Sequence, residues 1–307
     1  MRLLVVGAGA TGGYFGGRLA QAGRDVTFLV RPGRAAALRA DGLRIVSPHG
    51  DATLAPRLVT ADAIDGPYDA VLLAVKAYGL AGAMADLAPA VGPETMILPL
   101  LNGMRHMELL SARFGSMAVL GGVCKIAGTV DAEGRIVQLA GFHELAYGER
   151  DGTLSARTDR LDSVLRGAGF DARLTPEIER EMWEKWVMLA ALGGITCLMR
   201  GSTGEVVAAP GGADFAGRFL DEVVAVVGAV GTAPGSAFLA TTRAFLTEPG
   251  AGRTSSMYRD LQQGGPIEAD QIIGDLLVRG QAAGIDTPLL ALAATHLAVY
   301  QRRLAGG

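Results

Sequence analysis

A glycine-rich turn at the start of the chain constrains the fold more than any other feature. Four apolar residues, Leu3–Val6, lead into Gly7-Ala8-Gly9-Ala10-Thr11-Gly12. A short, fully apolar run that ends at glycine is typical of a buried parallel strand. Residues 14–22 are compatible with a helix that ends at Gly23, and Asp25–Val30 has the composition of a second strand. The first thirty residues therefore predict a strand, turn, helix and strand in that order.

In this context the glycines predict a dinucleotide site, because a spaced glycine trio between a buried strand and a helix is the fingerprint of such sites. Gly7 would permit the tight turn, Gly9 would let the backbone approach a pyrophosphate, and Gly12 would let the helix pack closely on the strand. Ala10 and Thr11 belong to the same turn, and the N-terminus of the helix that follows would face the anion. The alternative is that these glycines serve only a sharp turn.

The end of the second strand indicates which dinucleotide is bound. A site for NAD carries Asp or Glu there to accept a hydrogen bond from the ribose 2′-hydroxyl. This chain has Arg31, with Arg34 close behind, and no carboxylate. A guanidinium can bind a 2′-phosphate with two hydrogen bonds, whereas a carboxylate would repel it, so we expect NADPH. The alternative is that Arg31 is a solvated loop residue.

The remainder of the chain divides near Thr175. Apolar runs of strand length at 70–75 and 96–101, each followed by a helical stretch, predict an α/β domain with a doubly wound parallel sheet over residues 1–175. Lys76 and Asn102 directly follow these two runs, and polar residues at successive strand ends are expected to converge on one crevice. Further strands are expected over 117–148. The second domain, residues 176–307, is expected to be all-helical, with helices at 177–199, 215–230, 236–246, 254–263, 268–283 and 288–304.

Charge and cysteine content exclude several classes of protein. The 28 Lys and Arg residues against 31 Asp and Glu residues give a net charge of −3 without a dense basic run, so nucleic acid is not an expected partner. Cys124 and Cys197 fit neither a disulfide framework nor a metal site, and a reducing cytoplasm is the expected location. No histidine has the spacing of a zinc site, so no metal is expected. The longest uncharged stretch, 223–242, contains glycines and a proline, which argues against a membrane span.

One lysine of the helical half is a candidate acid. Hydride transfer to a carbonyl builds negative charge on oxygen, which an acid must meet. Lys185 lies between Trp183 and Trp186, the only two tryptophans of the chain. On the residues alone, Lys185 is more simply interpreted as an ordinary helix-surface lysine with Glu181 four residues before it.

Several motifs in order along the chain carry a family resemblance. They are Gly7-x-Gly9-Ala10-x-Gly12, Val75-Lys76-Ala77, Leu101-Asn102-Gly103-Met104, Trp183-x-Lys185, Ser255-Ser256-Met257 and Glu268-x-Asp270. Together they resemble the ketopantoate reductase (2-dehydropantoate 2-reductase) family over nearly the whole chain. The resemblance implies an N-terminal Rossmann domain and a helical C-terminal domain like that of 6-phosphogluconate dehydrogenase. It also implies NADPH-dependent reduction of 2-dehydropantoate to pantoate, on the way to pantothenate and coenzyme A.

The resemblance assigns a role to five residues. Lys185 matches the family's catalytic lysine, which protonates the keto oxygen, and Glu268 matches an acid that orients the substrate hydroxyl or the lysine. Asn102 matches an asparagine that lines the cofactor and substrate crevice, and Lys76 matches a residue on the cofactor side. Ser256 matches a serine that binds the substrate carboxylate. Without the resemblance, Ser256 would be interpreted as a helix cap and Glu268 as a solvated carboxylate.

The chain also departs from the family pattern. Family members typically carry asparagines four and eight residues after the catalytic lysine, where this chain has Leu189 and Gly193. Leu289 likewise stands where the family often has asparagine. Three functions therefore stay open: reduction of ketopantoate, reduction of a bulkier or more apolar 2-keto acid, and a non-catalytic NADPH-binding regulator. The apolar helical half makes a homodimer an expectation.

Overall fold

The computed structural model describes residues 1–306, which separate into two compact units. The first unit contains Met1–Leu101 and His106–Glu179. The second contains the chain from Arg180 onward together with a short excursion, Asn102–Arg105. These four residues follow the strand Met96–Pro99 and end at the first residue of the helix Arg105–Phe114, but they belong to the second unit.

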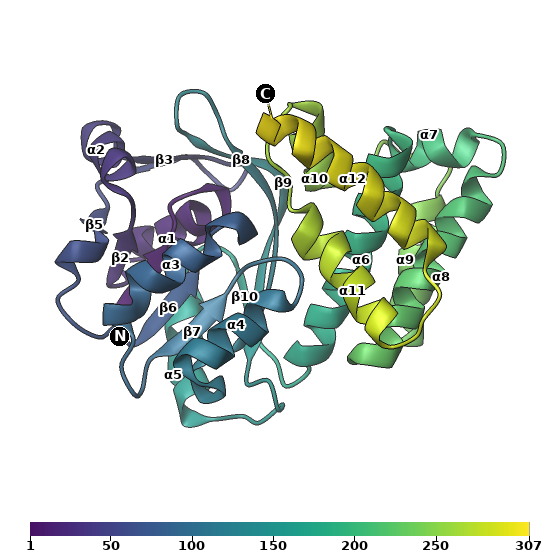
Figure 1. Ribbon diagram of the computed structural model, residues 1–307. Coiled ribbons are helices and arrows are strands. Elements are labelled where there is room, and N and C mark those ends of the chain that lie inside the picture. Colours follow the sequence, from purple (N-terminus) through teal and green to yellow (C-terminus); the bar gives the residue numbers. More distant parts are fainter. Residues whose placement is uncertain (307) are drawn as a thin grey trace. The chain divides into compact units, whose positions relative to one another are not determined.

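The first unit is built on a parallel sheet with the strand order β5-β2-β1-β6-β7. Its strands are β1 (Leu3–Val6), β2 (Val26–Leu29), β5 (Arg57–Val59), β6 (Ala70–Leu73) and β7 (Met96–Pro99). Strand β1 lies in the centre because its four residues are all buried and pair with β2 on one side and β6 on the other. The predicted Rossmann sheet is confirmed, with each predicted apolar run forming a strand (Figure 1).

A second sheet completes this unit. Its order is β10-β9-β3-β4, and β8 also pairs with β9. The strands are β3 (Leu43–Val46), β4 (Ala52–Leu54), β8 (Gly121–Val130), β9 (Ile136–Gly148) and β10 (Asp171–Leu174). The strands expected over 117–148 are therefore present as the long antiparallel pair β8 and β9.

Helix α1 (Ala10–Gln21) packs against both sheets, and its glycines make this possible. A Cβ atom at Gly13 would lie 2.3 Å from Cδ1 of Ile136 in the second sheet. A Cβ atom at Gly16 would lie 2.7 Å from the ring of Phe28 in the first sheet. The other helices of this unit are α2 (Pro32–Asp41), α3 (Leu80–Leu87), α4 (Arg105–Phe114) and α5 (Ala156–Leu165).

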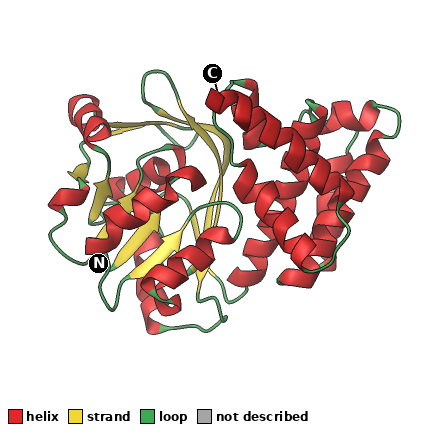
Figure 2. Ribbon diagram, viewed as in Figure 1, coloured by secondary structure: helices red, strands yellow, loops and turns green. Residues whose placement is uncertain are grey.

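From Ile178 onward, every described element of the chain is helical, as predicted (Figure 2). The helices are α6 (Ile178–Met199), α7 (Thr203–Ala208), α8 (Gly212–Val230), α9 (Ser236–Thr247), α10 (Ser256–Gln262), α11 (Asp275–Ala282) and α12 (Pro288–Gly306). The helix expected over 268–283 contains a π-helical turn, η5 (Asp270–Gly274), directly before α11. Within residues 1–306, no helix combines the length and the hydropathy that crossing a bilayer requires.

Candidate active site

The turn between β1 and α1 has a geometry that only glycine satisfies at two positions. Gly7 has a φ of +95°, a region that residues with a Cβ rarely adopt. A Cβ atom at Gly12 would lie 2.1 Å from the carbonyl oxygen of Gly7. A Cβ atom at Gly9, by contrast, would meet no atom within 4 Å, so the backbone at this position is open to an approaching group.

Helix α1 begins directly behind this open position. Gly9 is its N-cap and Ala10 its first residue, and the first turn contains no acidic side chain. The first backbone N–H groups of a helix lack partners inside the helix, and the helix dipole places partial positive charge beside them. The turn therefore fits a pyrophosphate both sterically and electrostatically.

The two arginines after β2 differ in their surroundings. Arg34 is half-buried and its Nη2 donates to the carbonyl oxygen of Ala8 at 3.2 Å and to that of Gly134 at 3.5 Å. Arg31 is exposed and is the N-cap residue of α2. Arg34 thus hydrogen-bonds the backbone of the glycine turn. Arg31 lies two residues beyond the last residue of β2, and its side chain is in solvent.

Lys76 and Asn102 follow neighbouring parallel strands. Strands β6 and β7 are paired, so their carboxyl ends lie at one edge of the sheet. Lys76 is exposed and precedes the 3₁₀ turn Ala77–Gly79. Asn102 lies three residues after β7, in the excursion that belongs to the second unit. The predicted convergence of the two residues on one crevice stays a prediction.

The turn at Asn102 is held by the π-helical turn η5. The side-chain Nε2 of Gln271 donates to the carbonyl oxygen of Asn102 at 3.0 Å. Gly103 has a φ of +77°, and a Cβ atom there would lie 2.7 Å from the backbone oxygen of Gln271. The backbone of this turn therefore lies directly against η5.

Lys185 lies on α6 and is half-buried, and the rings of its sequence neighbours Trp183 and Trp186 lie 5.5 Å apart between centroids. Trp186 is 1% exposed, and its Nε1 donates to the carbonyl oxygen of Ile272 in η5 at 3.0 Å. Trp183 packs on Gly231, where a Cβ atom would lie 2.4 Å from the indole ring. These contacts of the two indoles fix the rotation of α6 about its axis, and with it the side of the helix on which Lys185 lies.

Glu268 is not a solvated carboxylate. It is 7% exposed, and its carbonyl oxygen accepts a hydrogen bond from the backbone N–H of Ile272 at 3.0 Å. Glu268 lies two residues before η5, the turn that contacts Asn102 and Trp186. This turn therefore contacts the backbone of Asn102 and the neighbour of Lys185 on α6, and Glu268 leads into it.

Ser256 is not the helix cap that its sequence context allowed. The cap of α10 is Ser255, whose Oγ accepts from the backbone N–H of Tyr258 at 2.9 Å. The same Oγ is 3.0 Å from Oγ1 of Thr196 on α6, which holds the start of α10 against α6 about three turns after Lys185. Ser256, the first residue of α10, is exposed and leaves its hydroxyl for another partner.

Two further features of α6 bear on the chemistry. A Cβ atom at Gly193 would lie 2.8 Å from Cε of Met257, so the Met257 side chain fills the space beside this buried glycine. Burial raises the pKa of the Cys197 thiol to about 12, so this cysteine is protonated and unreactive at neutral pH. The sequence did not single out Gln271, and it included Met257 in a motif without assigning it a role, because neither type of residue signals a role by itself.

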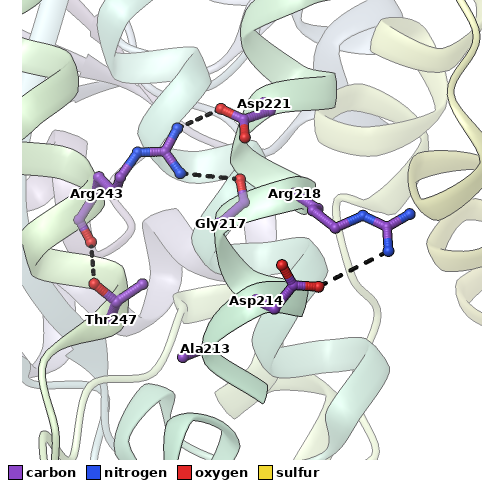
Figure 3. A pocket seen from close by; sticks show the side chains of 7 residues that line it. All are labelled: Ala213, Asp214, Gly217, Arg218, Asp221, Arg243 and Thr247. Carbon is purple, nitrogen blue, oxygen red and sulfur yellow. Dashed lines mark hydrogen bonds and ion pairs between the residues drawn. The ribbon is translucent and has the colours of Figure 1, made fainter. Parts of the chain in front are cut away.

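A separate hollow of about 330 Å³ lies between α8 and α9 (Figure 3). Arg243 pairs with Asp221 and also donates to the carbonyl oxygen of Gly217, and Arg218 lies 3.9 Å from Asp214. The hollow contains none of the predicted site residues. Since its two arginines face two aspartates, it offers no excess charge to a charged substrate.

Comparison with known proteins agrees with this architecture. The family model for ketopantoate reductase PanE/ApbA matches residues 3–152, and the model for the C-terminal part of that family matches residues 177–301. An uncharacterized oxidoreductase, YkpB of Bacillus subtilis, is 35% identical over 301 residues, which cover 98% of this chain and 99% of the relative.

Two further relatives have the family's name. A 2-dehydropantoate 2-reductase of Mesorhizobium japonicum is 29% identical over 314 residues, with 94% of each chain covered. The crystal structure of 2-dehydropantoate 2-reductase from Geobacter metallireducens superposes with a TM-score of 0.86 at 30% identity and covers 97% of this chain and 99% of that one. On these matches, the chain belongs to the ketopantoate reductase family of NAD(P)-dependent oxidoreductases.

Proposed function

We propose that this protein reduces ketopantoate (2-dehydropantoate) to (R)-pantoate with NADPH, a step toward pantothenate and coenzyme A. The observation that carries the proposal is that η5 contacts the Asn102 backbone and, through Trp186, the helix that carries Lys185, while Glu268 lies two residues before η5 in the same compact unit. The fold thus brings together segments whose candidate residues are at least 83 positions apart along the chain.

The cofactor part of the proposal depends on the glycine turn and on Arg31. Gly7, Gly9, Ala10, Thr11 and Gly12 would hold the pyrophosphate through backbone N–H groups. Arg31 would bind the 2′-phosphate, since its exposed guanidinium lies at the strand end where a carboxylate would select NAD. Lys76 would contribute positive charge on the cofactor side.

NADPH, when bound, supplies the hydride for the carbonyl carbon of the 2-oxo acid. The Lys185 ammonium donates its proton to the keto oxygen, so that the product is a neutral hydroxyl, and regains a proton from solvent. Glu268 orients the lysine or the new hydroxyl, and Ser256 donates a hydrogen bond to the substrate carboxylate. Asn102 lines the crevice in which substrate and cofactor meet. The partial burial of Lys185 limits the access of water that would compete with the lysine for the developing oxyanion.

One observation favours a second substrate class. Leu189 replaces an amide on the face of α6 that follows Lys185, and Met257 fills the space beside Gly193. A pocket with fewer hydrogen-bond partners binds the hydroxyl of ketopantoate less well and accepts apolar side chains better. The second candidate is therefore an NADPH-dependent reductase of a more apolar 2-oxo acid.

The experiment is a comparison of kcat/KM for NADPH oxidation with ketopantoate and with 2-oxo acids of increasing apolar side chains. A preference for ketopantoate supports the first proposal, and a preference of about tenfold or more for an apolar substrate replaces it with the second. Tight NADPH binding without oxidation by any 2-oxo acid would leave a non-catalytic regulator as the function.

We also infer a homodimer. Leu292 and Val299 are 54% and 43% exposed and lie one heptad apart, on one face of α12. Light scattering should give twice the chain mass of 31.7 kDa. A Leu292→Lys variant should shift the mass toward the monomer, whereas a Leu154→Lys variant, altered at an exposed leucine of the other unit, should not.

A further inference from the structure

The π-helical turn η5 forms long-range contacts from successive residues. Its Gln271 reaches a segment 169 positions earlier in the chain, and its Ile272 reaches α6, 86 positions earlier. A π turn inserts one extra residue into a helix, which redirects side chains and frees a carbonyl from the regular hydrogen-bond ladder. Turns of this kind occur frequently at functional sites.

The contact to the Asn102 turn is specific and buried. Gln271 is 7% exposed, and its amide donates to the carbonyl oxygen of Asn102 at 3.0 Å. The absence of a side chain at Gly103 lets the two backbones approach. Because Asn102–Arg105 belongs to the second unit although its flanking segments belong to the first, this contact is one that holds it there.

The second contact of η5 is with Trp186 of α6. The Trp186 indole donates to the Ile272 carbonyl oxygen at 3.0 Å, and Arg279 of α11 lies with its Cζ 5.7 Å from the same ring. Trp186 is the residue next to Lys185. One turn of helix therefore contacts both the Asn102 backbone and the helix that carries Lys185.

We infer that Gln271 is a positioning residue for the reaction: it fixes Asn102 relative to Lys185 through the π-helical turn. This inference rests on the proposed function, since it assigns Gln271 a task only if Asn102 and Lys185 act on one substrate. Misplacement of a substrate-contacting group by about 1 Å can reduce a rate by as much as a hundredfold. The hydrogen bond of Gln271 is therefore expected to matter for kcat rather than for cofactor binding.

The first test replaces the hydrogen-bond donor by an apolar side chain of similar length. A Gln271→Met variant should lose about tenfold in kcat, the effect of one hydrogen bond, while its KM for NADPH stays unchanged. The matched control is Gln281→Met, which alters an exposed glutamine at the end of the helix that continues from η5. Equal kcat values for wild type and Gln271→Met would overturn the inference.

The second test uses pH to restore the donor. In a Gln271→Glu variant, the ionised carboxylate cannot donate to the Asn102 oxygen, but the protonated acid can. The ratio of its kcat to that of the wild type should rise as the pH is lowered, whereas the ratio for Gln271→Met should stay flat. A flat ratio for both variants would show that the hydrogen bond to Asn102 is not the cause of the loss.

Two measurements separate positioning from general loss of structure. In an Asn102→Ala background, Gln271→Met should cause little additional loss of kcat, because the residue it acts through is gone. Full additivity would contradict the inference. Amide exchange at residues 103–105 should be faster in Gln271→Met than in wild type, and unchanged exchange would overturn the anchoring role.

The same data distinguish a failure of the proposed function from a failure of the inference about Gln271. If the wild type oxidises NADPH with none of the 2-oxo acids, the proposed function fails whatever Gln271 does. Amide exchange then decides alone whether Gln271 anchors the turn: faster exchange supports the anchor and unchanged exchange overturns it.

Discussion

At the scale of single residues, the two arginines after β2 have different surroundings. Arg34 hydrogen-bonds the glycine turn, so its guanidinium is partly committed to the protein itself. Arg31 is exposed, which leaves it for a ligand. The sequence placed both arginines near the cofactor, but it could not separate their roles, because the separation depends on where the carbonyl of Ala8 lies.

Replacement of Arg31 should therefore affect one cofactor only. In Arg31→Ala, the KM for NADPH should rise about tenfold or more through loss of charged hydrogen bonds, while the KM for NADH should change little. Steady-state kinetics with both cofactors measure this, and Arg39→Ala, an exposed arginine at the end of α2, is the control. An equal rise for both cofactors would contradict recognition of the 2′-phosphate.

His143 should make the stability of the protein sensitive to acid. Its pKa is lowered by burial first, then by stacked His49 at 3.7 Å between ring centroids and by Arg18, while Asp171 acts in the opposite direction. Tyr14 hydroxyl lies 2.7 Å from Nδ1 of the ring. The folded pKa thus lies below the unfolded value of about 6.5. As the pH falls from the unfolded pKa through the folded pKa, the unfolded chain binds more protons than the folded chain. The free energy of unfolding that His143 contributes at higher pH is therefore lost over this range.

Denaturant unfolding at several pH values checks this prediction. Wild type should lose more free energy of unfolding than His143→Gln between about pH 8 and about pH 5. His296, whose pKa burial also lowers, should leave the variant with some acid dependence. Parallel stability curves for the two proteins would contradict the role of His143.

At the scale of elements, α1 depends on glycine for its packing. The sequence predicted this helix from the strand before it and the glycine after it, and it assigned Gly12 to close packing. It did not predict that α1 lies between two sheets, because β3, β4 and β10 are short and the strands expected over 117–148 did not indicate which sheet they join. It also predicted a regular helix where η5 forms, because a π turn has no hydrophobic period of its own.

A Cβ atom at Gly12 should therefore be poorly tolerated. Gly12→Ala should lower the free energy of unfolding by about 1–3 kcal/mol, the usual cost of overpacking, and weaken NADPH binding. Gly33→Ala on α2 is the control, since a Cβ atom there meets nothing within 4 Å and alanine favours a helix. Chemical denaturation and cofactor titration measure both effects. A Gly12→Ala variant as stable as wild type would show that the turn is looser than its geometry indicates.

At the scale of the whole molecule, the α/β half and the helical half followed from the alternation of apolar runs and from the uninterrupted helical patterns after Pro176. The excursion of Asn102–Arg105 into the second unit did not follow. One hydrogen bond and one close backbone contact join this segment to Gln271, and neither leaves a pattern in the sequence. The candidate site could thus be assigned by resemblance residue by residue, but not its dependence on η5.

Cofactor binding should raise the stability of the molecule by mass action. NADPH at 100 times its Kd should add about 2.7 kcal/mol to the free energy of unfolding of the part that binds it. NADH at the same concentration should add less, because Arg31 then lacks the 2′-phosphate. Thermal unfolding with each cofactor measures the difference, and equal shifts would contradict the preference for NADPH.

The central claim is that the Lys185 ammonium gives its proton to the keto oxygen, and chemical rescue of Lys185→Ala tests it most directly. The variant should bind NADPH as wild type does and lose about a hundredfold or more in kcat, the contribution of a general acid. Added methylammonium should restore part of that rate in proportion to its concentration and should have no effect on the wild type. A Lys185→Ala enzyme that turns over at a rate close to the wild type, or a slow one that no amine accelerates, would contradict the claim.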